Sequence, residues 1–192
     1  MSKRYLKLSI GMVLFLLLAY FTCLSERAIK SNVLNQRGYK YDIYEKNEGF
    51  KFTLKKEWIT KLLESEEKKY KVDVYVYEDQ GSKIKLESLY SKSIGFISLV
   101  FKIEPKYNMI SGEIPLVNDI KYLDGDISYT SIKFKIDYED DEGNVIEGIG
   151  RWTFTGENKW FVISMEEKNL PKEELLDLRV YPLKILKYRL DI

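Results

Sequence analysis

The sequence contains no histidine and a single cysteine, Cys23, among its 192 residues. Histidine is the side chain whose ordinary pKa lies nearest neutrality, so its absence excludes Ser-His and Cys-His catalytic pairs and histidine-ligated zinc. Because one cysteine cannot complete the usual zinc ligand sets, structural zinc is excluded as well. No disulfide can form within the chain. The absence of histidine and of a second cysteine excludes many hydrolase mechanisms. Without a disulfide, the fold is predicted to be held by its hydrophobic core.

The sequence also lacks an excess of charge of either sign. Its 31 basic residues face 30 acidic ones, for a net charge of +1. Because nucleic-acid binding needs a concentrated basic face, we predict no nucleic-acid partner. Charged residues make up 32% of the chain and apolar residues 45%, which is typical of a globular protein rather than a disordered one. We find no internal repeat, low-complexity tract or domain linker.

One stretch has no charged residue at all, and it runs from Leu8 to Leu24. About 20 apolar residues in a helix match the hydrocarbon thickness of a bilayer, so we predict a transmembrane signal-anchor helix at residues 8–24, with the lipid bilayer as its partner. The basic leader at residues 1–7 carries Lys3, Arg4 and Lys7, which favours a cytoplasmic N-terminus. The expected protein is therefore single-pass in the cell membrane, with its C-terminal domain extracytoplasmic.

Two other fates of this segment stay open. A cleaved signal peptide ends in a small-residue A-x-A-like site, for which residues 23–25 are the nearest match. A bacterial lipoprotein would instead carry its lipid on Cys23, which follows a Tyr-Phe-Thr sequence. All three fates place the bulk of the chain outside the cytoplasm. An extracytoplasmic domain without cysteine is typical of a Gram-positive envelope.

The rest of the chain is long enough for one ordinary domain. Residues 25–38 are polar with scattered apolar positions, and we interpret them as a juxtamembrane stem that contains a short helix ended by Gly38. Residues 39–192 form the expected antiparallel-β domain. The 15 tyrosines and 9 phenylalanines of the whole chain favour strands, because aromatic rings suit a pleated, half-buried surface.

Alternating and helical periods predict the elements of the first half of this domain. Trp58, Ile59, Leu62 and Leu63 recur at helical spacing and predict a helix over residues 55–70. The strand at 94–103 is nearly all apolar, which suits a central strand covered on both faces, and Pro105 ends it. The remaining expected elements are an opening hairpin of strands 39–44 and 50–54 around a turn at 47–49, and strands 72–77 and 83–90 around a turn at 79–82.

The second half contains the clearest alternation, in which Ile132, Phe134, Ile136 and Tyr138 share one face. Residues 106–126 are less regular, with Gly112, Pro115, Asn118 and the 124–126 segment marking loops. The expected elements after them are a three-stranded antiparallel meander at 132–139, 146–154 and 160–165, a short helix over 171–178 that begins at Pro171, and a closing strand at 181–190. The predicted fold class is mainly β, as an antiparallel α+β sheet with one or two short helices, with a β-sandwich as the alternative.

Several residue groups resemble sites, but each has a simpler structural interpretation. The acidic run Asp137, Glu139, Asp140, Asp141 and Glu142 lacks the glycine and the flanking helices of an EF-hand, so it predicts a solvated hairpin turn. The segment at 124–126 is likewise a turn, and Ser65 and Lys68 have Ser-x-x-Lys spacing on a polar helix face. Trp58, Trp152 and Trp160 favour core positions over a sugar-stacking surface. We therefore assign no catalytic, cofactor-binding or metal-binding residue.

One short stretch carries a family resemblance. Residues 49–58 read glycine, an alternating strand from Phe50 to Leu54, and then Trp58, which resembles the opening of small exported PsbP/Mog1-like domains. That family usually has proline three residues before the tryptophan, where this chain has Lys55. The resemblance implies an antiparallel sheet flanked by helices and a non-enzymatic accessory role.

The predicted function is that of a membrane-anchored extracytoplasmic binding or accessory protein without enzymatic activity. The lack of His, of outer-domain Cys and of a catalytic constellation supports this prediction. A first alternative is a subunit of a larger membrane or envelope assembly, in which the anchor itself contacts a partner. Gly11 and Ala19 are small enough to admit a neighbouring helix. A second alternative is a cell-wall hydrolase that uses two carboxylates.

Overall fold

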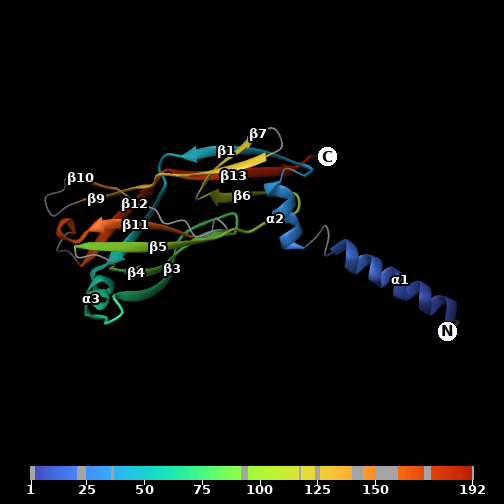
Figure 1. Cartoon of the computed structure of the whole chain (residues 1–192), viewed down its shortest axis with the longest axis horizontal. Coiled ribbons are helices and arrows are strands. Elements are labelled where there is room, and N and C mark those ends of the chain that lie inside the picture. Colours follow the sequence, from blue (N-terminus) through green and yellow to red (C-terminus); the bar gives the residue numbers. More distant parts are fainter. Residues whose placement is uncertain are drawn as a thin grey trace. The chain divides into compact units, whose positions relative to one another are not determined.

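The computed structural model describes residues 3–20, 25–35, 37–91, 95–116, 118–123, 126–139, 145–149, 160–170 and 174–191. In these residues the protein is mainly antiparallel β with three short helices (Figure 1). This confirms the predicted mainly β class. The chain divides into two compact units, a smaller one of Met1–Asp42, Tyr107–Gly112 and Lys187–Ile192, and a larger one of Ile43–Lys106 and Glu113–Leu186.

The smaller unit contains α1 (Lys3–Ala19), whose large apolar side chains from Ile10 to Leu18 are exposed. No helix in the part of the chain that the structure describes has the length and apolarity needed to cross a membrane. The described helix begins at Lys3, five residues before the predicted start, and the end of the predicted span, residues 21–24, lies outside the described ranges.

The short helix expected in the 25–38 segment is α2 (Glu26–Leu34). Ser25 caps it, because its hydroxyl accepts a hydrogen bond from a backbone N–H of the first turn at 3.2 Å. Ile29 and Val33 lie one turn apart and are both buried. Gly38 was expected to end this helix, but the helix already ends four residues earlier. Gly38 instead takes a positive φ of 75° beyond it.

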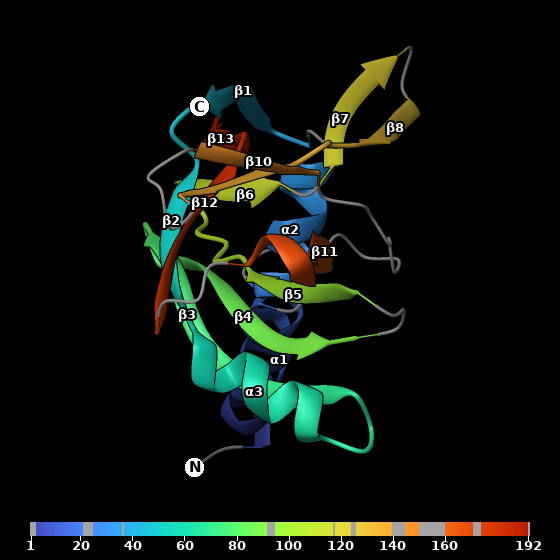
Figure 2. The same ribbon diagram turned by 90° about the vertical axis from the view of Figure 1, so that its left-hand side faces the viewer.

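The larger unit is built mostly from two four-stranded sheets. The first has the order β10-β9-β12-β2 and the second the order β11-β5-β4-β3 (Figures 1 and 2). The strands of the first sheet are β2 (Phe50–Lys55), β9 (Lys135–Glu139), β10 (Val145–Ile149) and β12 (Leu175–Tyr181). Those of the second are β3 (Lys69–Asp79), β4 (Ser82–Tyr90), β5 (Phe96–Glu104) and β11 (Trp160–Glu166).

The remaining elements are shorter sheets and two helical segments. One three-stranded sheet has the order β1-β13-β6, and β7 and β8 pair as a hairpin. Their bounds are β1 (Tyr39–Lys46), β6 (Ser111–Leu116), β7 (Asn118–Leu123), β8 (Asp126–Ser131) and β13 (Leu183–Leu190). The helical segments are α3 (Lys56–Glu64), which contacts β2, β3 and β4, and the 3₁₀ turn η2 (Glu167–Asn169).

Aromatic rings join the two four-stranded sheets across one core. Phe50 and Phe52 of β2 meet Phe101 of β5 edge-on, with ring centroids 5.9 and 5.5 Å apart. Phe101 stacks on Phe161 of β11 at 4.8 Å, and Phe161 stacks on Phe134 at 4.5 Å. Such pairs bury large apolar area and prefer these geometries. The core therefore lies between the inner faces of two sheets, the arrangement that the sandwich alternative describes.

The predicted opening hairpin is wrong, although both of its strands exist. The turn at 47–49 forms, with the N–H of Gly49 donating to the carbonyl of Lys46 at 2.9 Å. Beyond it the strands diverge, because β1 pairs with β13 while β2 pairs with β12 from Phe50 to Lys55. The turn thus carries the chain from one sheet into another rather than back along its own strand.

The first hairpin of the predicted meander is confirmed, and the second stays a prediction because most of its first strand lies outside the described residues. β9 and β10 pair antiparallel, and β11 pairs with β5 at every position from Trp160 to Glu166. The second partner of β9 is β12, near the end of the chain. Residues 150–159, which include most of the expected second strand and the following turn, lie outside the described residues. Local alternation identifies strands, but the partner is chosen by long-range packing.

Both domain helices also differ from prediction. The helix expected at 55–70 ends at Glu64, and Lys69 already belongs to β3. The helix expected at 171–178 is wrong, because β12 begins at Leu175 and residues 171–173 lie outside the described ranges. In β12, Leu176, Leu178 and Val180 are buried at alternate positions between the neighbours β9 and β2. Tertiary pairing therefore outweighs the local helical pattern.

The central position of β5 is confirmed, since β4 and β11 flank it and it ends at Glu104, directly before Pro105. Its expected cover on both faces is not complete, because Phe96 is 41% exposed and Val100 is only half-buried. The expected loops at Gly112 and Pro115 lie within β6 instead. Pro115 is tolerated there because β6 is an edge strand of its sheet.

Candidate functional site

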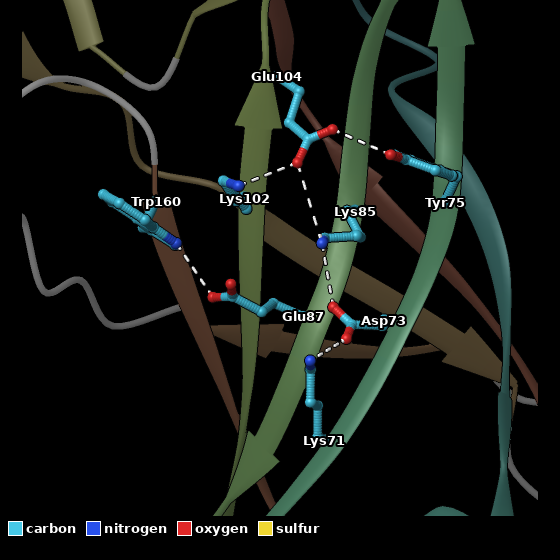
Figure 3. Close-up of polar contacts among 8 residues, drawn as sticks. All are labelled: Lys71, Asp73, Tyr75, Lys85, Glu87, Lys102, Glu104 and Trp160. Carbon is cyan, nitrogen blue, oxygen red and sulfur yellow. Dashed lines mark hydrogen bonds and ion pairs between the residues drawn. The ribbon is translucent and has the colours of Figure 1, made fainter.

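The outer face of the sheet β11-β5-β4-β3 carries a set of eight side chains, of which six form one polar network and two, Glu87 and Trp160, form a separate hydrogen-bonded pair (Figure 3). In β4, Lys83 and Lys85 alternate with the fully buried Ile84 and Leu86. Successive side chains of a strand point to opposite faces, so one face of β4 packs into the core while the other presents charges. We call the eight residues of this set the polar face: Lys71, Asp73, Tyr75, Lys85, Glu87, Lys102, Glu104 and Trp160.

Glu104, at the end of β5, is the carboxylate at one end of the polar face. Its oxygens accept hydrogen bonds from Lys102 Nζ and from the Tyr75 hydroxyl, both at 3.0 Å, and Lys85 Nζ lies 3.9 Å away (Figure 3). The hydrogen bond from Lys102 is the largest influence on the pKa of Glu104 and lowers it, against the opposing effect of burial. Glu104 is therefore held as an anion by groups from three strands.

Asp73 lies at an irregularity in β3, where the register with β4 shifts between Lys71 and Val74. Its φ of 56° is in the left-handed region, which aspartate tolerates better than most residues. The carboxylate contacts Lys71 Nζ at 2.5 Å and Lys85 Nζ at 3.0 Å. These hydrogen bonds, that from Lys71 first, lower the pKa of Asp73, and the bond to Asp73 raises the pKa of Lys85. A bulge of this kind re-aims a side chain, here toward a lysine of the next strand.

A second irregularity lies in β4 at Glu87. The register of β4 on β5 shifts between Leu86 and Ser88, so Glu87 is the inserted residue. Its carboxylate accepts a hydrogen bond from Trp160 Nε1 at 3.0 Å, which bridges β4 to β11 over β5 (Figure 3). The two irregularities together place an acidic side chain on each of two neighbouring strands.

A smaller cluster surrounds Lys46 in the larger unit. Its Nζ lies 2.7 Å from Asp79 and 3.2 Å from the Tyr77 hydroxyl. The hydrogen bond with Asp79 raises the pKa of Lys46 and lowers the pKa of Asp79. The Tyr44 hydroxyl donates to Glu113 at 2.7 Å, and burial, followed by that bond, raises the pKa of Tyr44 to about 12. These shifts favour the charged forms of Lys46 and Asp79 and the neutral form of Tyr44, which are the forms that already predominate at pH 7.

The tryptophans that could form a sugar-binding surface do not lie together in the described residues. Trp58 is half-buried on α3, with Lys55 Nζ 5.6 Å from its ring centroid. Trp160 is half-buried on β11 and bonded to Glu87. Trp152 lies outside the described residues. Trp160 is therefore the tryptophan that belongs to the polar face.

The Ser-x-x-Lys pair and the acidic segments have structural roles where the structure describes them. Ser65 is the C-cap residue directly after α3, and Lys68 Nζ donates to the carbonyl of Leu63 at 2.8 Å. Asp137 lies in β9 and accepts a bond from the Tyr181 hydroxyl at 2.9 Å. Residues 140–144 and 124–125 lie outside the described ranges. Among the described side chains, no group of three or more acidic residues or cysteines is placed to hold a metal ion.

The polar face was not identified from the sequence. Its signal is the alternation of charges at Lys83, Lys85 and Glu87 and again at Lys102 and Glu104. Alternation shows that one face of each strand is polar, but it does not show which strands are neighbours. No family model, curated protein or solved structure matches the chain. The resemblance of residues 49–58 to PsbP/Mog1-like domains stays a prediction.

Proposed function

We propose that the protein is a membrane-anchored extracytoplasmic binding or accessory protein, with α1 as part of a single-pass anchor and the polar face as its binding surface. The observation that carries this proposal is the exposure of α1. From Ile10 to Leu18, its large apolar side chains are 48–69% exposed. Apolar surface that is open on all sides of a helix is unfavourable in water, at about 25 cal/mol per Å². A bilayer removes that cost.

The direction of insertion follows from the charges. Lys3, Arg4 and Lys7 precede the apolar segment. Basic residues next to a membrane span remain on the cytoplasmic side, so the sheets are extracytoplasmic in this proposal. The absence of histidine and of a second cysteine is compatible with a domain that binds rather than catalyses.

The polar face suits a binding role because its side chains are already ordered. Lys85 retains 17% of its side-chain exposure and Lys102 retains 28%, while both are held by carboxylates. Side chains fixed in the free protein lose less entropy on binding. The face carries charges of both signs and one half-buried indole, which favours a protein partner of complementary charge pattern over a polyanion.

The directions of the pKa shifts support a non-enzymatic role. A carboxylate hydrolase needs a general acid whose pKa is raised, so that it is protonated near neutral pH. The pKa values of Asp73, Asp79 and Glu104 are instead lowered by lysines. In this proposal these carboxylates serve as paired anions on the surface of the sheets.

The test is co-purification of partners from detergent-solubilised membranes, with the full-length chain at native level. Lys71→Glu reverses a 75% exposed charge on the polar face, and Lys61→Glu on α3 is the matched control, since both lysines are paired with a carboxylate. We expect a partner that the control retains and Lys71→Glu loses by tenfold or more. Equal retention by both variants would contradict the polar face as the binding surface.

A third variant, in which an unrelated apolar helix replaces residues 1–24, separates the proposal from its main alternative. A binding module keeps its partner when the anchor is exchanged. Loss of the partner with the native anchor would instead indicate a subunit of a membrane assembly, in which the anchor makes specific contacts. Turnover of a cell-wall substrate by the purified protein would overturn the non-enzymatic assignment.

A further inference from the structure

We propose that the segment Tyr107–Gly112 of the smaller unit is a second membrane contact, in which Met109 and Ile110 enter the interfacial region of the bilayer. The proposal rests on the proposed anchoring by α1. It adds a lipid-binding surface to the folded part of the chain.

The two apolar side chains are open to solvent at adjacent positions. Met109 is 42% exposed and Ile110 is 63% exposed. A single exposed apolar residue on a surface is ordinary, but two exposed neighbours directly before β6 form a small apolar patch. Moving these side chains out of water is favourable in proportion to the apolar area that is removed from water.

The backbone of this segment is fixed by hydrogen bonds from other parts of the same unit. The Tyr39 hydroxyl donates to the carbonyl of Met109 at 2.7 Å, and the N–H of Leu190 donates to the carbonyl of Ile110 at 2.6 Å. The Tyr188 hydroxyl accepts from the N–H of Asn108 at 2.7 Å and donates to its carbonyl at 3.0 Å. The apolar side chains are therefore presented by a rigid frame, although they are not themselves buried by it.

Two buried tyrosine rings support that frame. Tyr39 and Tyr188 meet edge-on, with ring centroids 5.7 Å apart, and both are more than nine-tenths buried. At Gly112 a Cβ would lie 2.6 Å from the Tyr188 hydroxyl oxygen, so the backbone passes directly against this ring. Two tyrosines and a close glycine contact thus hold the backbone of a segment whose apolar side chains at positions 109 and 110 are exposed.

The lipid surface is the partner that the chain connection favours. The segment belongs to the same compact unit as α1 and α2. The connection between these helices is short, and the N–H of Ser25 donates back to the carbonyl of Tyr20 at 2.7 Å. An anchor followed by so short a connection keeps the unit close to the bilayer. Under tethering at an effective concentration on the order of millimolar, even a weak contact is populated.

The charges of the unit agree with this assignment. In its described residues beyond α1, exposed or half-buried basic side chains outnumber acidic ones. The basic set is Arg27, Lys30, Arg37, Lys40, Lys187 and Arg189, and the acidic set is Glu26, Asp42 and Asp191. Basic residues near a lipid surface are attracted by its anionic head groups. The unit is therefore suited to a surface of phosphate-bearing lipids.

The test places a nitroxide label at one site at a time in the full-length protein. The background is Cys23→Ser, and the labelled variants are Ile110→Cys, Val145→Cys and Phe15→Cys. Val145 lies in the larger unit and is 61% exposed, so it matches Ile110 in size and exposure. Each protein is reconstituted in vesicles of phosphatidylcholine with a minor component of phosphatidylglycerol. Accessibility to oxygen, which concentrates in lipid, is compared with accessibility to a water-soluble nickel complex.

We expect the label at position 110 to be more accessible to oxygen than to nickel, and the label at position 145 to show the reverse. A label at position 110 that behaves like the one at 145, in water or in lipid, would overturn the proposal. The label at position 15 reports on the anchor separately. Lipid exposure at 15 without it at 110 contradicts the second contact alone, whereas water exposure at 15 contradicts the anchor.

Discussion

At the scale of single residues, the larger unit depends on places where one backbone passes directly against another. Gly49 is the clearest of them. It ends the turn after β1 with a positive φ of 62°, and an added Cβ would lie 1.9 Å from the carbonyl oxygen of Val180. Arg179 holds the same turn, with its guanidinium donating to the carbonyls of Asn47 and Glu48 at 3.0 and 2.9 Å. The crossing from one sheet to the next is thus fixed at a glycine.

Gly49→Ala is therefore expected to lower the free energy of unfolding by about 2–4 kcal/mol, since the methyl group must displace the β12 backbone. Gly38→Ala is the matched control. Gly38 also has a positive φ, 75°, but an added Cβ there would have no atom within 4 Å. We expect about 1 kcal/mol there, from backbone strain alone. Urea unfolding followed by tryptophan fluorescence measures both, and equal losses would contradict the close approach.

Glu104 gives a prediction about pH. Its pKa is lowered in the folded protein, chiefly by Lys102. A lowered pKa adds stability that is present above the unfolded value of about 4.3 and is lost as pH falls through the folded value. Glu104→Gln should therefore cost about 0.5–1 kcal/mol at pH 7, because the ion pair is partly exposed, and less in acid.

The measurement for Glu104 is the pH dependence of urea unfolding between neutral and acidic conditions. Wild type should lose more stability on acidification than Glu104→Gln does. Glu64→Gln is the control, because it removes the same charge at an exposed position of α3, away from the polar face. A Glu104→Gln curve parallel to that of wild type would show that this carboxylate gains nothing from its lysine partners.

At the scale of elements, α3 shows that only part of the apolar stripe of a helix is fully buried. Its amphipathic stripe was expected to bury Trp58, Ile59, Leu62 and Leu63 together. In the structure Leu62 is fully buried against the β strands, whereas Leu63 is 38% exposed. Figure 2 shows α3 beside β3 and β4, both of which it contacts. Leu62 is therefore the fully buried residue of this stripe, while Trp58 and Ile59 are half-buried.

Leu62→Ala should cost about 2–4 kcal/mol of unfolding free energy, because it removes a fully buried side chain and leaves a cavity. Leu63→Ala, one position along the same helix, should cost less than about 1 kcal/mol. Helix propensity changes equally in the two variants, so the difference isolates burial. Thermal unfolding of both proteins, followed by the fluorescence of Trp58 and its fellow tryptophans, would show this order. The reverse order would contradict the orientation of α3.

The hairpin of β3 and β4 was predicted correctly, whereas the hairpin of β7 and β8 was not predicted. β3 and β4 pair around Gln80 and Gly81, both with positive φ, and the turn was expected at 79–82. Short two-residue turns of this kind force neighbouring strands to pair, so the local sequence is sufficient. The turn at 47–49 looks similar in sequence but leads into another sheet. What distinguishes the two is the partner that each strand meets later in the chain.

At the scale of the whole molecule, the apolar side chains of α1 and those of the sheets have different surroundings. The sheets bury their aromatic residues against one another, while α1 exposes its apolar side chains. In the proposed anchor, a bilayer rather than the sheets covers the apolar side chains of α1. Substitutions in α1 should therefore affect membrane association without affecting the stability of the sheets.

The double substitution Leu14→Asp and Leu16→Asp tests this separation. Each residue is about 60% exposed, at 60% and 59%. A charged residue at the centre of a membrane helix costs about 2.5–3.5 kcal/mol, so we expect the variant to be released by alkaline carbonate while wild type stays in the membrane pellet. The melting temperature of the sheets should not change. Retention of the variant in the pellet, or lowered stability, would contradict the anchor.

Prediction of the candidate site from the sequence was limited because the sequence does not show which strands are neighbours or in which register they pair. The sequence shows that β4 and β5 each have a polar face, and it identifies Trp160 as a large aromatic residue on a strand. It does not show that Glu87 is inserted as a bulge, or that the next strand but one brings Trp160 within 3.0 Å of it. These contacts depend on register, which a shift of one residue reverses. Asp73 likewise faces Lys85 because of an irregularity in β3 that no local pattern announces.

By itself, the sequence determined the mainly β class, the position of most strands, the apolar N-terminal segment and the exclusion of histidine and disulfide chemistry. These properties follow from composition and from short-range periodicity, which every folded state of this chain must respect. The tertiary structure decided which strands pair, where β12 replaced an expected helix, and which side chains meet on the polar face. Those outcomes depend on contacts between residues far apart in the chain, because a strand is completed only by its neighbours and by the core that they share.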